Sequence, residues 1–161
     1  MDFKTLKKIK LFIYDFDGVM TNNKVYIDST GNEIVQVNRS DGLGVAEIKK
    51  LGYEQLIISS EKNSVVSARA EKLNIPYVQG VSNKKRELIT HCKINKLMLK
   101  NVAFIGNDLN DYEAMIISGY SFCPADAHVD IIRISKHKLT SKGGQGVVRE
   151  LLDLIKNSLG E

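Results

Sequence analysis

Cysteine is scarce in this sequence, and the two that occur are not placed for metal binding or cross-linking. Cys92 and Cys123 are far apart, form no Cys-x-x-Cys pair and have no patterned histidines beside them. Structural zinc sites need closely spaced ligands, and disulfide frameworks need more cysteines than this. We therefore expect two reduced thiols. Residues 1–10 contain no long apolar segment of the kind found in secretory leaders, so we expect a cytoplasmic location.

Long apolar runs and strong charge asymmetry are also missing. No stretch approaches the roughly 20 apolar residues that a membrane-spanning helix needs. The formal net charge is +4, and the lysines and arginines are scattered, with no basic tail. Nucleic-acid-binding surfaces usually show clustered basic residues. We expect neither a membrane protein nor a nucleic-acid-binding protein.

Proline is rare as well, and no segment rich in proline, glycine or serine divides the chain. Hydrophobic residues make up 43% of the 161 residues, which is ordinary for a globular protein. A chain of this length can bury one substantial core. We expect residues 1–161 to form a single domain.

Short apolar runs alternate with helical patterns along the chain. The runs cover Ile9–Tyr14, Gln55–Ser59 and Val102–Ile105, and the helical patterns cover Gly42–Leu51, Ser64–Leu73 and Lys84–Cys92. Continuous apolar runs indicate strands that are buried on both faces, and the alternation indicates βαβ units. The sequence therefore predicts a Rossmann-like α/β fold, a three-layer sandwich with a central parallel sheet.

Two segments depart from this alternation. Lys24–Asp28 and Glu33–Asn38 alternate in polarity around a turn-forming stretch, which predicts a β-hairpin inserted after the first strand. Val147–Ser158 has the periodicity of an amphipathic helix, and glycines precede it. Asp41 stands just before the pattern that begins at Gly42, so we expect it to cap that helix.

Polar residues follow the apolar runs where a parallel sheet would bind a ligand, outside the carboxyl ends of its strands. Asp15 and Asp17 follow the first run and, being two apart, can share one site. One could attack while the other transfers protons. Asp108 follows the last run and would complete an oxygen-rich pocket for Mg²⁺. Ser59 and Lys84 would bind the remaining oxygens of a phosphoryl group.

Each of these residues also has an ordinary structural interpretation. A lone Asp-x-Asp at a strand end is often only a turn or a helix cap, and a lone lysine is often a solvated helix residue. Asp111 can equally be a first-turn acid that favours the helix dipole. Only the occurrence of all these residues together favours a catalytic role over a structural one.

That joint pattern resembles the four motifs of the haloacid dehalogenase superfamily of phosphatases, in order and over nearly the whole chain. The matching segments are 15–19, Ser59, Lys84 and 106–111. The resemblance narrows to a small branch without a cap domain, whose members act on octulosonate 8-phosphates or on sialic-acid-type nonulosonate 9-phosphates. Supporting stretches are 38–42, 79–84, 124–127 and 143–150.

The resemblance implies roles for these residues. Asp15 would be the nucleophile and Asp17 the general acid and base, with Ser59 and Lys84 completing the catalytic set. Asp15, Asp108 and the Asp17 main-chain carbonyl would hold Mg²⁺. It further implies a homotetramer in which a neighbour's hairpin and tail help to close each site. Further residues expected at the substrate or around the metal are Ser60, Glu61, Lys72, Asp111, Gly143 and Gly144.

The substrate expected from the resemblance is a sugar phosphate. Octulosonate phosphatases usually carry Thr-Gly-Arg after the second strand, whereas this chain has Ser59, Ser60 and Glu61. Glu61 followed by Lys72 is more similar to relatives that act on nonulosonate 9-phosphates, so we favour that class and keep octulosonate 8-phosphate as the alternative. Two other classes stay open, a receiver-like phosphoacceptor domain and a non-catalytic oligomerisation module.

Overall fold

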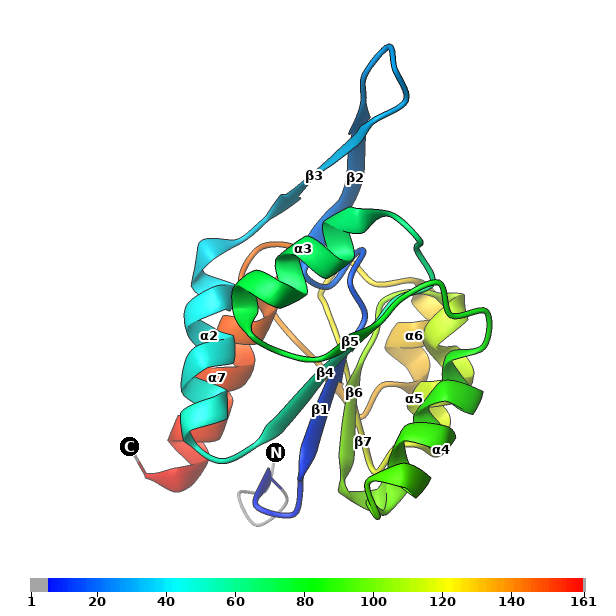
Figure 1. The fold of residues 1–161 in the computed structure, drawn as a ribbon. Coiled ribbons are helices and arrows are strands. Elements are labelled where there is room, and N and C mark those ends of the chain that lie inside the picture. The colour runs from blue at the N-terminus through cyan, green and yellow to red at the C-terminus, as the bar shows by residue number, and fades with distance from the viewer. Residues whose placement is uncertain (1–5, 161) are drawn as a thin grey trace.

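The computed structural model of the protein describes residues 6–160, and a six-stranded parallel sheet runs through its centre (Figure 1). The strands lie in the order β5-β4-β1-β6-β7-β8, and every neighbouring pair is parallel. Their bounds are β1 Leu11–Tyr14, β4 Glu54–Ile58, β5 Tyr77–Val78, β6 Val102–Ile105, β7 Tyr120–Cys123 and β8 His137–Lys138. The order reverses direction beside β1, and this opens a crevice at the carboxyl ends of β1 and β6.

Helices cover both faces of this sheet (Figure 1). One face carries α2 (Arg39–Lys50), α3 (Ser64–Leu73) and α7 (Val147–Leu159), and the other carries α4 (Lys84–Ile94), α5 (Tyr112–Ile117) and α6 (Val129–Ile134). Two short 3₁₀ turns, η1 (Leu99–Asn101) and η2 (Leu109–Asp111), flank β6. The predicted three-layer fold is confirmed.

Strand β1 shows why the sheet is buried on both faces. Phe12 and Tyr14 belong to the apolar cluster under α2, α3 and α7, whereas Leu11 and Ile13 belong to the cluster under α4, α5 and α6. Successive side chains of a strand point to opposite faces, so a continuous apolar run feeds both cores. Each such side chain contributes about 1.5–3 kcal/mol of burial free energy.

The predicted hairpin is also present and forms a separate two-stranded sheet, β2 (Thr21–Ile27) and β3 (Glu33–Val37), that projects from the body (Figure 1). Its tip is closed by Asp28, whose Oδ1 accepts the amide hydrogens of Thr30 at 2.8 Å and Asn32 at 2.9 Å. At its base the register shifts between Thr21 and Val25. Asn23 lies in that irregularity with φ 60°.

The prediction that Asp41 caps α2 was wrong. Asn38 is the N-cap and accepts the Ser40 amide hydrogen at 2.8 Å. Asp41 lies in the first turn of α2 and is buried, and its Oδ1 accepts the amide hydrogens of Val148 at 2.9 Å and Arg149 at 3.1 Å. These amides lie at the positive end of the α7 dipole, which stabilises the Asp41 carboxylate. Asp41 therefore ties α2 to α7, two elements that sequence spacing could not pair.

Within residues 6–160, none of the helices combines the length and the apolar character that crossing a bilayer would require.

Candidate active site

A pocket of about 340 Å³ opens at the carboxyl ends of β1, β4 and β6. Asp15 directly follows β1, Ser59 directly follows β4, and Asn107 follows β6 after one glycine. The pocket is lined by Asp15, Asp17, Asn23, Ser59, Ser60, Glu61, Asn107, Asp108 and Asn110. The sheet therefore gathers residues that lie far apart in the sequence, as expected for the switch point of a parallel sheet.

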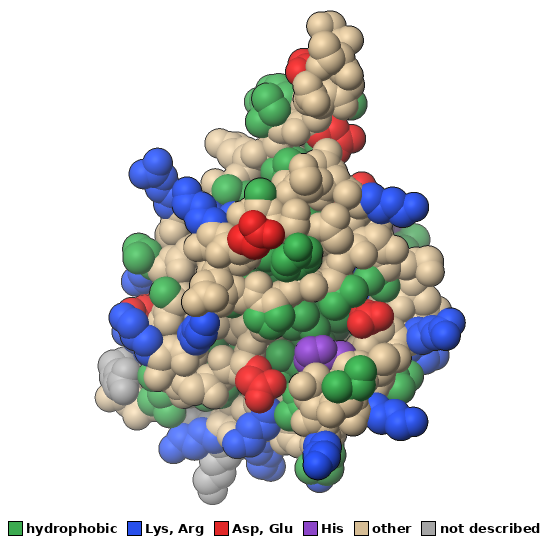
Figure 2. All heavy atoms as spheres, in the orientation of Figure 1, with side chains coloured by type: hydrophobic (Ala, Val, Ile, Leu, Met, Phe, Trp, Pro, Cys, Tyr) green, Lys and Arg blue, Asp and Glu red, His purple; other side chains and the backbone are tan. Residues whose placement is uncertain are grey.

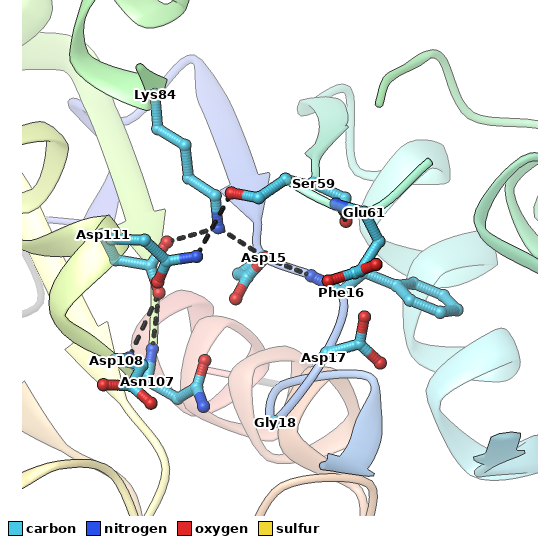
Figure 3. A network of polar contacts seen from close by, with 12 residues as sticks. Asp15, Phe16, Asp17, Gly18, Ser59, Glu61, Lys84, Asn107, Asp108 and Asp111 are labelled. Atoms are coloured by element: carbon cyan, nitrogen blue, oxygen red, sulfur yellow. Dashed lines mark hydrogen bonds and ion pairs between the residues drawn. The ribbon is translucent and has the colours of Figure 1, made fainter. Parts of the chain in front are cut away.

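Lys84 reaches this site from the first turn of α4, which Asn83 caps (Figure 3). Its ammonium lies 2.6 Å from Asp15 Oδ1 and 2.7 Å from Asp111 Oδ1. All three side chains are at most 5% exposed. A buried ammonium requires this kind of pairing, because an unpaired charge in the interior is very costly.

The charges of these three residues do not cancel, since one ammonium faces two carboxylates. Burial and the neighbouring Asp111 carboxylate raise the pKa of Asp15 to about 7, although Lys84 opposes the shift. Burial disfavours the Lys84 ammonium, but Asp15 and Asp111 outweigh that effect and raise its pKa. The two shifts are compatible, because the lysine gains from both acids while each acid repels the other. The residual negative charge suits a cation.

Asp17 lies on the hairpin side of the pocket. Its Oδ1 accepts a hydrogen bond from Thr21 Oγ1 at 3.0 Å, so the first residue of β2 fixes its orientation. Burial raises the pKa of Asp17, the Thr21 hydrogen bond opposes the shift, and the Glu61 carboxylate adds to it. A carboxyl group with a raised pKa can carry a proton closer to neutral pH, as a general acid must.

Ser59 and Ser60 form the β4 side of the pocket. Ser59 is buried, and its Oγ accepts the Glu61 amide hydrogen at 3.1 Å. A hydroxyl that accepts through its oxygen can still donate its hydrogen to a ligand. Ser60 Oγ accepts a hydrogen bond from Asn110 Nδ2 at 3.2 Å. Ser59 can therefore donate a hydrogen bond to an anion in the pocket, and Ser60 forms part of a fixed rim around that anion.

Asp111 organises the loop that follows β6. Its Oδ2 accepts the amide hydrogens of Asn107 at 2.9 Å and Asp108 at 3.3 Å, while Oδ1 accepts from Lys84. A Cβ at Gly106 would lie 2.6 Å from Asp111 Cβ, so only glycine leaves room for this arrangement. Asp111 therefore holds the loop after β6 in shape and pairs with Lys84, in addition to lying in the first helical turn after β6.

Asn107 is the residue that sequence reasoning missed. With its amide nitrogen turned inward, it donates to Asp15 Oδ2 at 3.0 Å and to the Asp17 main-chain oxygen at 2.9 Å. Turned over, its Oδ1 would face those same two oxygens, an arrangement that a bound cation would stabilise. Gly18 permits the approach, because a Cβ there would lie 2.5 Å from Asn107 Cγ. The sequence did contain a signal for it, because Asn107 directly precedes Asp108 in the motif at residues 106–111.

Asp108 lies at the border of the same pocket (Figure 3). Its Oδ1 accepts the Leu109 amide hydrogen at 2.7 Å and caps η2. It therefore has a structural partner in addition to its place at the pocket.

The donor set fits a magnesium ion. Within residues 6–160, no group of three or more His, Cys, Asp or Glu side chains is arranged to hold a metal. The oxygens available to a cation instead belong to the Asp15 carboxylate, the Asp17 main-chain carbonyl and, when the amide of Asn107 turns its oxygen inward, the Asn107 side chain. Mg²⁺ takes oxygen ligands and typically uses only one or two carboxylates, completed by water and phosphate oxygens.

Comparison with known proteins decides the family. The haloacid dehalogenase-like hydrolase family matches residues 45–151. The 3-deoxy-D-manno-octulosonate 8-phosphate phosphatase of Escherichia coli is 33% identical over 156 residues, covering 96% of this chain and 83% of that protein. This chain belongs to the haloacid dehalogenase-like hydrolases.

Two solved structures of such phosphatases support the assignment. The Moraxella catarrhalis enzyme, solved with magnesium, phosphate and KDO, is 30% identical with a TM-score of 0.93, covering 97% of this chain and 90% of its own. The cobalt-bound Haemophilus influenzae enzyme is 29% identical with a TM-score of 0.91, covering 97% and 92%. Membership in this hydrolase family removes the receiver-domain alternative.

In this haloacid dehalogenase-like hydrolase, Lys72 does not reach the pocket of its own chain. It lies with Arg39 and Arg69 in a hollow between α2 and α3. No ion pair joins it to Glu61 among the described residues. Glu61 precedes α3, whereas Lys72 lies in its last turn on the side toward α2, so the helix separates them.

Gly143 and Gly144 pack against their own chain. A Cβ at Gly143 would lie 2.3 Å from the Gly18 main-chain oxygen, and one at Gly144 would lie 2.6 Å from the Asn22 amide nitrogen. Gly144 also has φ 67° and donates its amide hydrogen to the Val19 oxygen at 3.0 Å. The close packing of these glycines against the loop after β1 explains why glycine is needed at both positions. The expectation that they lie near a neighbour's substrate remains a prediction.

Proposed function

We propose that this hydrolase removes the terminal phosphate of a 3-deoxy-ulosonate phosphate with Mg²⁺, through an aspartyl phosphate on Asp15. The observation that carries the proposal is the arrangement of Asp15, which lines an open pocket while Lys84 holds its Oδ1 at 2.6 Å. Asp17 lines the same pocket and is held by Thr21. A nucleophile beside a separately oriented acid is what two-step phosphoryl transfer requires.

In the first step, a carboxylate oxygen of Asp15 forms a bond to phosphorus as the bond to the sugar oxygen breaks. Asp17 gives its proton to that leaving oxygen, and the raised pKa of Asp17 favours its starting in the protonated form. Lys84 and the Ser59 hydroxyl stabilise the charge on the phosphoryl oxygens. The products are a free alcohol, an acyl phosphate on Asp15 and an Asp17 carboxylate.

In the second step, Asp17 accepts a proton from a water molecule as that water forms a bond to phosphorus. The bond between phosphorus and Asp15 then breaks, which releases inorganic phosphate and restores the Asp15 carboxylate. Asp17 ends protonated and ready for another cycle. Thr21, which holds Asp17 Oδ1 at 3.0 Å, keeps that carboxyl beside the reacting centre in both steps.

For the metal, we propose Asp15, the Asp17 main-chain carbonyl and Asn107 as ligands, with Asp108 as the other candidate. When bound, Mg²⁺ would neutralise charge on the phosphoryl group and offset the repulsion between two anions. The magnesium in the Moraxella catarrhalis structure supports this assignment by similarity.

For the sugar, the comparisons favour octulosonate 8-phosphate, because the E. coli and Moraxella catarrhalis relatives are phosphatases of that compound. Glu61 favours the second candidate, a nonulosonate 9-phosphate. It lines the pocket where octulosonate phosphatases usually place an arginine, and a carboxylate there would accept hydrogen bonds from hydroxyl groups.

For the assembly, we propose a homotetramer built around the hairpin. Tyr26, Ile27 and Ile34 are 60–72% exposed on β2 and β3, although large apolar side chains are usually buried. A second copy of the chain could cover them and reach the nearby pocket.

A turnover comparison tests the function directly. Purified protein with Mg²⁺ is assayed against octulosonate 8-phosphate and several nonulosonate 9-phosphates, with a chelated sample as control. Release of phosphate that stops on chelation supports the proposal, and the better substrate identifies the sugar. Absence of turnover on every ester, or full activity after thorough chelation, would contradict it.

A further inference from the structure

A second hollow, of about 220 Å³, adjoins the phosphate pocket on the hairpin side. The two hollows share Asp17, Asn23 and Glu61. The second is otherwise lined by Val25, Glu33, Val35, Asn63 and Val65. Since Asp17 is proposed to protonate the leaving oxygen, the space beyond Asp17 is where the carbons attached to that oxygen would lie.

Glu33 is held in place at this hollow by a residue of a different element. It is the first residue of β3, and its Oε2 accepts a hydrogen bond from Asn63 Nδ2 at 2.9 Å. Asn63 is fixed in turn, because its Oδ1 accepts the Val65 amide hydrogen at 3.1 Å and caps α3. This chain of contacts ties the end of β3 next to the hairpin tip to the start of α3, and it orients a carboxylate toward the hollow.

Asn23 stands where the two hollows meet. It occupies the irregular segment of β2 and has φ 60°, a left-handed conformation that asparagine tolerates better than most residues. It lines both hollows. The polar groups around the second hollow are therefore three carboxylates and two amides, and the apolar lining comes from three valines.

The lining of both hollows contains no lysine or arginine among the described residues. Carboxylates and amide oxygens accept hydrogen bonds from hydroxyl groups, and valine side chains pack against C–H groups. A carboxylate in the same place would face Glu33 and Glu61 without a counter-charge, which is unfavourable at this partly buried position. The lining matches a hydroxylated carbon chain.

We propose that Glu33, positioned by Asn63 and acting with Asn23, forms a leaving-group subsite that binds hydroxyl groups on the carbons next to the phosphate ester and rejects an anionic group there. This rests on the proposed function, because it assumes phosphate ester cleavage at Asp15. Any carboxylate of the substrate then lies at the end of the molecule remote from the phosphate.

Two three-carbon esters give a matched test. Glycerol 3-phosphate and 3-phosphoglycerate share a skeleton and differ in having a hydroxymethyl or a carboxylate group at the far carbon. We expect kcat/KM of the wild type to favour glycerol 3-phosphate by about tenfold or more, since a hydrogen bond to a charged group is worth about 1.5–3 kcal/mol. p-Nitrophenyl phosphate, which lacks hydroxyl groups on its leaving group, serves as the reference substrate.

Glu33→Gln should lower kcat/KM for glycerol 3-phosphate, mainly through KM, and should improve 3-phosphoglycerate, so that their ratio falls about tenfold. Turnover of p-nitrophenyl phosphate should stay within about twofold. Asn63→Ser keeps a capping side chain on α3 but removes the donor to Glu33, and should shift the ratio in the same direction. Glu54→Gln, the same change at an exposed residue of β4, should leave all three substrates unaffected.

The possible failures are distinguishable. Equal effects of Glu33→Gln on all three esters, or no change in the ratio, would overturn the subsite while leaving phosphatase chemistry intact. Preference of the wild type for 3-phosphoglycerate, or for phosphoethanolamine over ethylene glycol monophosphate, would show an anion or ammonium site instead. No turnover even of p-nitrophenyl phosphate with Mg²⁺ would overturn the proposed function and the subsite together.

Discussion

Lys84 Nζ lies 2.6 Å from Asp15 Oδ1, and both side chains are buried. The contact joins the start of α4 to the end of β1, and Asp111 holds the other side of the same ammonium at 2.7 Å. One cation therefore supports the nucleophile and the loop after β6 together (Figure 3). In contrast to this single buried cation, lysines and arginines on the exterior are spread around the face that Figure 2 shows.

Replacing Lys84 should damage both stability and activity. Lys84→Met would leave Asp15 and Asp111 facing each other without a cation, and breaking a buried ion pair typically costs about 3–5 kcal/mol. Urea unfolding at neutral pH without Mg²⁺ measures this loss. Lys85→Met is the matched control, because Lys85 is 40% exposed and its pair with Glu113 is 3.4 Å long. Equal stability of the two variants would show that the buried cation is dispensable.

The metal ligands can be separated by two neighbouring substitutions. If Asn107 provides a ligand, Asn107→Asp adds a negative charge and should tighten Mg²⁺ binding by about tenfold or more. Asp108→Asn should change the affinity far less, since Asp108 caps η2. Isothermal titration calorimetry with Mg²⁺ alone measures both. A large loss of affinity in Asp108→Asn with little change in Asn107→Asp would assign the site to Asp108.

Asp15 should give the metal-free protein an unusual pH dependence. Its pKa is raised from 3.8 to about 7 in the folded protein, so between these values the folded form holds a proton that the unfolded chain has lost. The free energy of unfolding should therefore fall as the pH rises through this range. Asp15→Asn should remove that slope, which denaturation of both proteins in chelator at several pH values would reveal. An identical pH dependence of the two proteins would contradict the shift.

The hairpin should control assembly. Tyr26→Lys together with Ile34→Lys places charges on its exposed apolar surface and should dissociate the proposed homotetramer, as measured by light scattering after size-exclusion chromatography. Ile94→Lys is the control, since Ile94 is 73% exposed at the end of α4. A double hairpin variant that keeps the mass of the wild-type assembly would exclude this surface as the interface.

The sequence was informative where a local pattern fixes the structure. The apolar run of β6 and the helix Ser64–Leu73 were predicted with the bounds that the structure shows, because burial on both faces and helical periodicity are local properties. Strands β5 and β8 have two residues each, which is too short for any period to appear. Strand β7, with Tyr120 and Ser121, offered no comparable apolar run.

The site was predicted in outline, whereas its details depend on how distant segments of the chain pack together. Asp15, Asp17, Ser59 and Asp108 line one pocket as expected, with Lys84 bound to Asp15 behind it. Sequence could not show that Asn107 turns toward Asp15 and Asp17, since this depends on the space left by Gly18. Nor could the sequence show that Lys72 lies in a different hollow, between α2 and α3. Lys72 and Glu61 are close in sequence, but helix α3 separates them in space.

The account rests on a covalent bond to Asp15, and detecting that bond is its most direct test. Wild-type protein mixed with substrate and Mg²⁺ is quenched in acid within one turnover, digested and examined by mass spectrometry. We predict one added phosphoryl group on the peptide that contains Asp15, and neither this adduct nor turnover in Asp15→Asn. A phosphoryl group on another residue, or turnover by Asp15→Asn at the wild-type rate, would contradict the account.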